Sequence, residues 1–301
     1  MSAVLFHIGY SKAGSTFLKN WFTEHPEILL GGFKTYEALS TYVENIDEKN
    51  SKELFVLSNH IFNLFKWDFK QPLDSWMAKS GLYEYQGNMC STIHSLFPNA
   101  KVLFVTRGYY SILKSFYSEY IRTGGRYTCS GMIEEHGDNF LQKTYNYNYL
   151  ITLYIKKIGK ENVIALPYEQ LKNDPDQFLR NLEKSLNLNY YDFSKNSINP
   201  SLENGVLYWY RYFSNFVFKL SRLLGHKGGN ALYGLYTKLL LNGYFYLFAK
   251  ALSRLFKRIE VIDLLPQQLD KFRNKASVLK EFPCYKEHYE AYLIDQSTPT
   301  N

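Results

Sequence analysis

Runs of consecutive apolar residues alternate with segments of helical spacing from Val4 to Leu188. A short, continuous apolar run is typical of a strand that is buried on both faces of a parallel sheet. The intervening segments repeat apolar positions every three or four residues, as amphipathic helices do. This alternation predicts an α/β fold with a central parallel sheet flanked by helices. The predicted strands are Val4–Ile8, Ile28–Leu30, Leu54–Leu57, Lys101–Thr106 and Asn162–Leu166, and the predicted helices include Phe17–Phe22, Tyr83–Leu96, Tyr110–Tyr120, Phe140–Ile158 and Asp174–Leu186.

The pattern changes after Leu188, where helices are predicted but no strand. We therefore expect two regions, with their boundary in the loop Asn187–Pro200. The first is a core over residues 1–190, and the second is an all-helical C-terminal extension over residues 191–301 that packs on it.

The first predicted strand leads through a glycine-bracketed turn into the first predicted helix. Gly9 and Gly14 enclose this turn, and Ser15 and Thr16 stand where the helix begins. Such a turn directs backbone N–H groups and the positive end of a helix toward a phosphate. A nucleotide-triphosphate loop would have a lysine at the position of Ser15, whereas the only lysine of this turn is Lys12. The glycine-bracketed turn is therefore kept, but its lysine stands at position 12, inside the turn, rather than at position 15.

The segment SKAGST, residues 11–16, resembles the 5′-phosphosulfate loop of sulfotransferases that use 3′-phosphoadenosine-5′-phosphosulfate (PAPS). The resemblance implies a P-loop-like sulfotransferase core. The alternative for this segment taken alone is an ordinary strand-to-helix turn with a surface lysine, because short glycine motifs often match by chance. By this resemblance, PAPS as donor and PAP as product would be held at Lys12, Ala13, Gly14, Ser15, Thr16 and Phe17.

A second motif follows the clearest predicted strand, KVLFVT. Arg107 closes this strand, and Ser115 lies eight positions later in the next predicted helix. A guanidinium fork suits phosphate oxygens, and a hydroxyl adds a donor. The pair resembles the 3′-phosphate motif of the same family, and its occurrence together with SKAGST favours the sulfotransferase assignment.

Two weaker resemblances complete the nucleotide site. Tyr168 in LPYEQLKNDP follows a predicted strand, and its likeness to a family segment implies a contact with the adenine. The alternative for Tyr168 is an aromatic side chain packed beneath a helix start. Lys227 in HKGG has a faint likeness to a family loop, which implies closure over the 3′-phosphate.

Sulfuryl transfer from PAPS needs a base for the acceptor hydroxyl and a cation at the bridging oxygen of the leaving phosphate. Lys12 suits the second role as a point charge on a flexible stem. For the base, His60 in FVLSNHIF follows a predicted strand, and histidine has a suitable pKa. His60 resembles the catalytic histidine of the soluble sulfotransferases, although the proline of their THLP-type motif is absent. Glu37 in FKTYEAL is the rival, because carbohydrate sulfotransferases of this fold often use a glutamate after the second strand.

Two other classes of protein remain as alternatives. A P-loop kinase or NTPase would want an acidic residue after a strand to hold Mg²⁺, whereas the best-fitting strand ends in Arg107. A non-catalytic PAP-binding module would share the nucleotide site without turnover. No metal is expected, and Cys90, Cys129 and Cys284 lack the spacing of a zinc site.

Cysteine usage and hydropathy bear on location. Three scattered cysteines argue against a disulfide framework and favour a reducing compartment. The first predicted strand begins by Val4, which leaves no room for a signal peptide, and no apolar run reaches the length of a membrane span. We therefore expect a cytoplasmic protein.

The net charge of +7 is unevenly distributed, because residues 204–259 contain nine Lys and Arg and no Asp or Glu. In each of two predicted apolar helices over residues 206–258, the polar positions form a narrow stripe, and a helix whose polar side carries only cations suits an anionic membrane surface on the inner side of the membrane. These positions are Arg211, Asn215, Lys219 and Arg222 in the first helix, and Lys238, Asn242, Lys250, Arg254 and Arg258 in the second. The alternative is that the helices pack on each other and the cations are solvated. No nucleic-acid-binding signature accompanies the charge. With 18% aromatic residues, we expect a sugar or glycolipid acceptor, with a small alcohol or phenol as the competitor.

Overall fold

The apolar runs of the first half of the chain form one sheet of five parallel strands in the order β2-β3-β1-β4-β5. The computed structural model describes residues 3–31, 54–64, 73–193 and 202–294. This sheet and the helices around it confirm the predicted α/β class. The strands are β1 (Ala3–Gly9), β2 (Ile28–Gly31), β3 (Leu54–Asn59), β4 (Lys101–Thr106) and β5 (Val163–Pro167).

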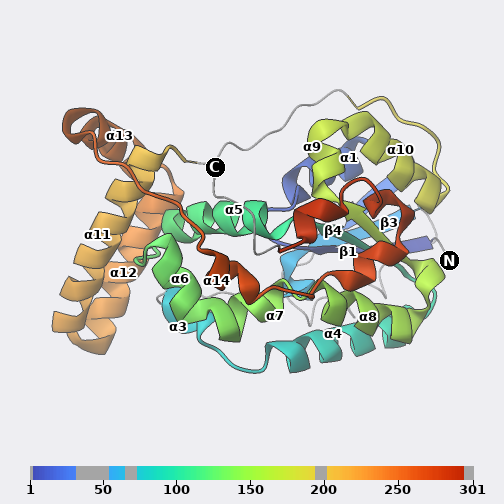
Figure 1. Ribbon diagram of the computed structural model, residues 1–301, viewed down its shortest axis with the longest axis horizontal. Coiled ribbons are helices and arrows are strands. Elements are labelled where there is room, and N and C mark those ends of the chain that lie inside the picture. Colours follow the sequence, from blue (N-terminus) through green and yellow to red (C-terminus); the bar gives the residue numbers. More distant parts are fainter. Residues whose placement is uncertain (1–2, 32–53, 65–72, 194–201, 295–301) are drawn as a thin grey trace.

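Helices cover both faces of the sheet, which explains why its strands are apolar throughout. Every residue of β5 is buried, as are five of the six residues of β4. Figure 1 shows α1, α9 and α10 on one side of the strands and α4 and α8 on the other. The helices of this part are α1 (Ser15–Glu24), α3 (Leu73–Met77), α4 (Leu82–Leu96), α5 (Tyr109–Arg122), α6 (Cys129–His136), α7 (Gln142–Thr144), α8 (Tyr147–Ile158), α9 (Tyr168–Asn173) and α10 (Pro175–Leu186).

The parallel arrangement brings four predicted site residues to one edge of the sheet. Lys12 follows β1, and His60 begins the 3₁₀ turn η1 (His60–Phe62) directly after β3. Arg107 directly follows β4, and Tyr168 directly follows β5. In open α/β sheets, ligands bind beyond the carboxyl ends of the strands.

The single helix predicted over Phe140–Ile158 is wrong, because the chain is interrupted at Tyr145. A π-helical turn, η2 (Gly137–Leu141), and α7 precede the break, and α8 starts afresh at Tyr147. The side chain of Asn146 caps α8 by accepting a hydrogen bond from the Tyr149 N–H, 3.1 Å away. The break buries the rings of Tyr145 and Tyr147 beneath the turn that follows β1, where both contact Tyr10.

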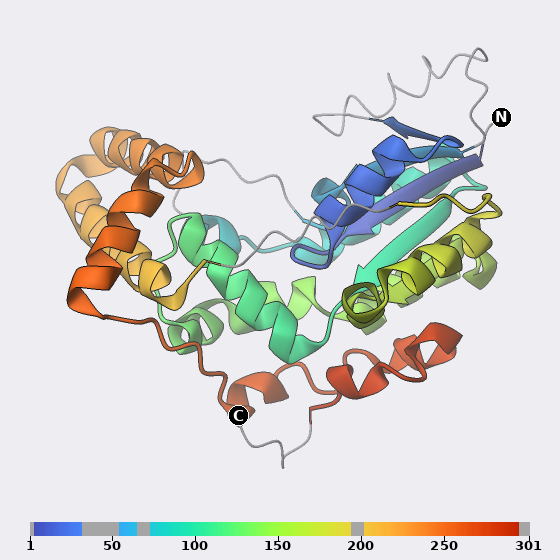
Figure 2. The ribbon, with the colours of Figure 1, turned by 90° about the horizontal axis from the view of Figure 1, so that it is seen from above.

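The C-terminal part forms a helical lobe and then returns to the core. Helices α11 (Asn204–Leu223), α12 (Gly225–Leu241) and α13 (Tyr244–Phe256) stand at one end of the molecule, beyond α5 (Figure 1). Gly243, with φ of 75°, separates α12 from α13. Figure 2 shows the following segment running back along the core through α14 (Pro266–Asp270). It ends in the 3₁₀ turns η4 (Ser277–Glu281), η5 (Pro283–Tyr285) and η6 (Tyr289–Tyr292).

Candidate nucleotide-binding site

The loop between β1 and α1 has the geometry of an anion cradle. Lys12 and Gly14 adopt left-handed backbone angles, with φ of 69° and 82°. The N-cap residue of α1 is Gly14, which has no side chain to cap the helix, and the positive end of the helix faces the loop. A Cβ at Gly14 would lie 2.6 Å from Leu171 and 3.4 Å from the ring of Tyr168. Glycine is therefore required here, because α9 packs directly on the loop.

The other residues of the SKAGST segment have different surroundings. Ala13 is buried, so its side chain is not available to a ligand. Ser15 and Thr16 are the first residues of α1, where their hydroxyls can reach an anion. The ring of Phe17 packs edge-on against Phe193, with 5.4 Å between centroids.

Arg107 joins the loop to the end of the neighbouring strand. Its guanidinium donates a 2.9 Å hydrogen bond to the carbonyl oxygen of Lys12. The same guanidinium lies 4.4 Å from the centroid of the Tyr168 ring. The structure thus brings Lys12, Arg107 and Tyr168 together from three strand ends.

Ser111, rather than Ser115, is the hydroxyl partner of Arg107. Arg107 Nε donates to Ser111 Oγ at 2.8 Å, and Ser115 lies one turn later, buried in α5. The sequence motif assigns Ser115 to the 3′-phosphate, and the contact between Ser111 and Arg107 does not test that prediction. Ser111 occupies position i+4 from Arg107 and was not singled out from the sequence.

Hydrogen bonds from neighbouring side chains fix the turn that carries Arg107. Tyr147 donates from its hydroxyl to the Arg107 carbonyl oxygen at 2.7 Å. Glu169 accepts from the backbone N–H of Gly108 at 2.9 Å and from the Tyr292 hydroxyl at 3.0 Å. No role was predicted for these three residues from the sequence. Tyr292 in particular is far along the chain and could only be found in the folded structure.

The ammonium group of Lys12 has a carboxylate neighbour. Lys12 Nζ lies 3.5 Å from Glu119 Oε2 on α5, and Arg122 forms a second ion pair with the same carboxylate. Partial burial would raise the pKa of Glu119, but the hydrogen bond and charge of Arg122, with the charge of Lys12, lower it below its ordinary value. Glu119 is therefore ionised at neutral pH and keeps Lys12 at the loop.

Of the two candidate bases, the structure describes His60. Its side chain is exposed at the surface, and the surrounding protein atoms together with the charge of Lys19 lower the pKa of His60. Its imidazole is therefore neutral at neutral pH, as a general base must be. Glu37 lies outside the described residues. The other histidine near this edge, His7, is buried in β1 and hydrogen bonds to Ser58 at 2.8 Å.

Lys227 is not brought to the nucleotide site. It is exposed in the first turn of α12. This helix meets the core at Gly124, whose carbonyl oxygen accepts a hydrogen bond from Tyr233. Gly124 follows the C-terminal end of α5, whereas Arg107 precedes its N-terminal end. Because α5 has 14 residues and is about 20 Å long, this contact is far from Arg107. As for metals, no group of three potential His, Cys, Asp or Glu ligands gathers within the described ranges.

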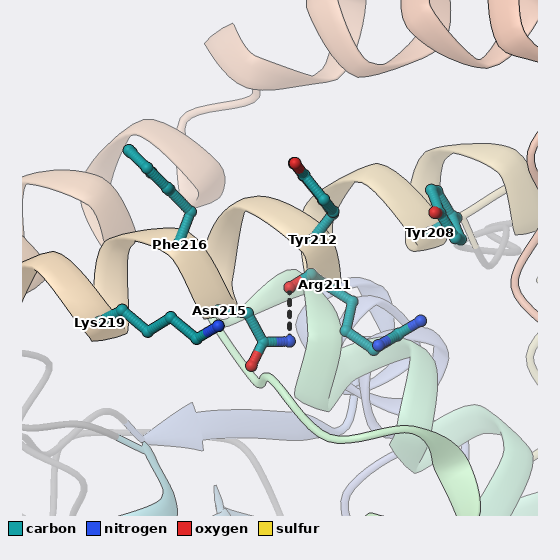
Figure 3. A pocket seen from close by; sticks show the side chains of 6 residues that line it. All are labelled: Tyr208, Arg211, Tyr212, Asn215, Phe216 and Lys219. Atoms are coloured by element: carbon teal, nitrogen blue, oxygen red, sulfur yellow. Dashed lines mark hydrogen bonds between the residues drawn. The ribbon is translucent and has the colours of Figure 1, made fainter.

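A hollow of about 340 Å³ lies along α11 in the C-terminal lobe. Figure 3 shows the side chains that line it, which come from two rows of the same helix. The aromatic row is Tyr208, Tyr212 and Phe216, and the polar row is Arg211, Asn215 and Lys219. Asn215 also hydrogen bonds to the carbonyl oxygen of Arg126, in the loop that follows α5.

Comparison with known proteins identifies the class of this fold. Residues 86–192 match the sequence profile of the sulfotransferase family. A sulfotransferase from Alicyclobacillus acidocaldarius has a similar structure, with a TM-score of 0.50 and 13% identity over 80% of this chain and 96% of that chain.

Two further solved structures are more distant. The sulfotransferase domain from the curacin biosynthetic pathway has a TM-score of 0.43 and 15% identity, over 93% of this chain and 98% of that chain. A mouse sulfotransferase complexed with PAP has a TM-score of 0.40 and 15% identity, over 63% of this chain and 60% of that chain. No curated protein matches the sequence significantly.

Proposed function

Since residues 86–192 match the sequence profile of the sulfotransferase family and the fold is similar to that of a solved sulfotransferase, we propose that the protein transfers a sulfuryl group from PAPS to an acceptor hydroxyl. One observation carries the proposal. The Arg107 guanidinium rests on the Lys12 carbonyl oxygen and on the Tyr168 ring. Two anion-binding groups and an aromatic platform therefore adjoin at neighbouring strand ends, as a nucleotide with phosphates at both its 3′ and 5′ positions requires.

The residues fit the donor as follows. The loop Gly9–Gly14 and the start of α1 would receive the 5′-phosphosulfate, where backbone N–H groups and the helix end favour negative charge. Arg107, supported by Ser111 and with Ser115 further along α5, would bind the 3′-phosphate. Tyr168 would offer its ring to the adenine.

The reaction would be an in-line displacement at sulfur. The acceptor oxygen forms a bond to sulfur while the bond between sulfur and the phosphate oxygen breaks. That oxygen leaves with the electron pair on PAP, next to the positive charge of Lys12. The proton of the acceptor hydroxyl passes to the base, for which His60 and Glu37 are both candidates.

The choice between the two bases can be made from pH profiles. If His60 is the base, His60→Gln lowers kcat by about 100-fold or more, and the acid limb of the wild-type profile lies below the ordinary histidine pKa of about 6.5. This follows because a lowered pKa keeps the imidazole neutral to lower pH. Glu37→Gln is the matched variant and would then retain most of the activity. The reverse pattern, with an unchanged acid limb in the His60 variant, would assign the base to Glu37.

For the acceptor, we propose a carbohydrate, free or carried by a glycolipid. The hollow along α11 supports this choice, because its aromatic row offers flat apolar surface and its polar row offers donors and positive charge. A small phenol or alcohol is the competitor. The protein would act in the cytoplasm. The basic helices of residues 206–258 would bind the inner, anionic surface of the membrane.

The activity can be tested directly with PAPS that carries labelled sulfur. The protein would be incubated with a panel of glycans, glycolipids and phenols, in the presence and in the absence of EDTA. We expect label on a glycan or glycolipid, at a rate that EDTA leaves unchanged. A strict requirement for a divalent metal would instead favour a kinase or NTPase, and PAP binding without transfer to any acceptor would favour a binding module.

A further inference from the structure

Helix α13 exposes a row of apolar side chains to solvent. Tyr244, Leu247 and Leu255 are 75%, 73% and 75% exposed. Leu247 and Phe248 lie three and four residues after Tyr244, and Leu255 lies two turns after Phe248, so the four residues lie along one side of the helix. The opposite side, which includes the fully buried Ala249, packs against α11. An ordinary surface helix has the reverse arrangement, with polar residues outward.

The exposed row continues onto α11. The ring of Phe248 packs beside Phe213 of α11, with 5.8 Å between centroids. Leu220 lies on the same side of α11 as Phe213, two turns later, and Leu223, three residues further on, is 83% exposed. A contiguous apolar surface of this kind marks an interaction site. We call this surface the docking face; it comprises Leu220, Leu223, Tyr244, Leu247, Phe248 and Leu255.

The charges around the docking face are mostly positive. Residues 204–259 carry nine cations and no carboxylate. Among the described residues, only Arg211 and Lys250 of these nine form an ion pair, with Glu260 and Glu203. Three of the unpaired cations lie at the end of α13, next to Leu255, and all three are exposed: Arg254, Lys257 and Arg258.

We propose that the docking face binds a membrane surface that contains anionic lipids. Its apolar side chains would enter the boundary between headgroups and acyl chains, and its cations would meet the lipid phosphates. The helix would lie in the plane of the interface, since α13 has 13 residues and is about 20 Å long, whereas a hydrocarbon core is about 30 Å thick. Consistently, no helix in the described part of the chain combines the length and apolarity of a membrane span.

A second copy of this chain suits the face less well. Two such faces would bring like charges together around an apolar centre, which opposes association. An anionic lipid surface offers charges of the opposite sign and a broad apolar layer at once.

This inference rests on the membrane partner of the proposed function, for which it names the binding surface. It also suggests how the protein would reach a glycolipid acceptor. The hollow along α11 shares its helix with the docking face, and Phe216 of the hollow lies one turn before Leu220 on the same side of α11. An acceptor headgroup at the membrane would therefore lie close to the hollow. Lipid binding needs neither donor nor turnover, so its failure would be distinguishable from failure of the sulfotransferase assignment.

The test is co-sedimentation of the full chain with phosphatidylcholine vesicles, with or without roughly one phosphatidylglycerol in four lipids. We expect binding to the anionic vesicles only, and we expect salt to weaken it. Arg254→Gln/Lys257→Gln/Arg258→Gln should weaken binding on the order of 100-fold. Leu247→Ser/Leu255→Ser should weaken it by about tenfold or more. The matched control, Lys156→Gln/Arg180→Gln/Lys184→Gln, removes three exposed cations from α8 and α10 and should bind like wild type.

Circular dichroism and thermal unfolding would show that each variant is folded, which is expected because all the replaced residues are exposed. Absence of binding to anionic vesicles would overturn the proposal, as would equal losses in the control variant. Sedimentation velocity adds a further check. A dimer that Leu247→Ser/Leu255→Ser converts to a monomer, without lipid binding, would assign the face to a second copy instead.

Discussion

Replacing Lys12 with alanine is expected to lower kcat for sulfuryl transfer by about 100- to 1,000-fold. The physical reason is that negative charge develops on the leaving phosphate oxygen, and Lys12 is the cation of the loop that would receive it. PAP affinity should fall as well, by about tenfold, because the product carries this charge already. Single-turnover rates with labelled PAPS and PAP titrations by calorimetry would measure the two effects separately.

The Lys12 variant should remain folded. The ion pair with Glu119 is partly exposed, and Glu119 keeps its second partner, Arg122. Lys184→Ala, on α10, is the matched control because it removes an exposed lysine of the core. Wild-type rates and affinity in the Lys12 variant would remove this residue from the proposed mechanism.

Replacing Arg107 with alanine is expected to weaken PAP binding by roughly 10- to 100-fold, the range for loss of a charge-assisted bidentate contact. The loss should depend on the 3′-phosphate. Adenosine 5′-monophosphate lacks that group, so its affinity should change far less in the same variant. Measuring both nucleotides with both proteins therefore gives a cycle that isolates the contact between Arg107 and the 3′-phosphate.

Two further variants sharpen the result for Arg107. Arg107→Lys keeps the charge but loses the planar fork that contacts Ser111, the Lys12 carbonyl and the Tyr168 ring, so it should recover only part of the affinity. Arg180→Ala on α10 removes an exposed arginine of the core and should leave both affinities unchanged. An equal loss for the two nucleotides in Arg107→Ala would contradict a 3′-phosphate role and indicate a general effect on the loop.

Secondary structure was predictable where the local pattern was unambiguous. The strand KVLFVT has the same bounds, Lys101–Thr106, in the prediction and in the structure, because a run of apolar residues leaves few other conformations that can be buried. The helix predicted over Phe140–Ile158 failed for the complementary reason. Its apolar spacing fits a helix, but Tyr145 and Tyr147 are drawn under the loop at Tyr10, and Asn146 supplies a local cap for a new helix.

The candidate site also has a part that the sequence predicted and a part that it did not. Lys12, Arg107 and Tyr168 were nominated from sequence because each follows a strand, and parallel strands must end at a common edge. Their actual contacts depend on side chains that meet only after folding. The hydrogen bond from Arg107 to Ser111, for example, was not specified by the sequence motif.

The sequence by itself determined the α/β class, the strands and the turns at which phosphates would bind, because these follow from apolar periodicity and from glycine at positions that tolerate no side chain. Only the tertiary structure decided which groups support those turns and which surfaces stay exposed. Tyr292 reaches Glu169 across more than a hundred residues of chain, and the apolar row of α13 faces outward rather than into a core. Both outcomes depend on how distant segments compete for the same packing surface, and no local pattern contains that information.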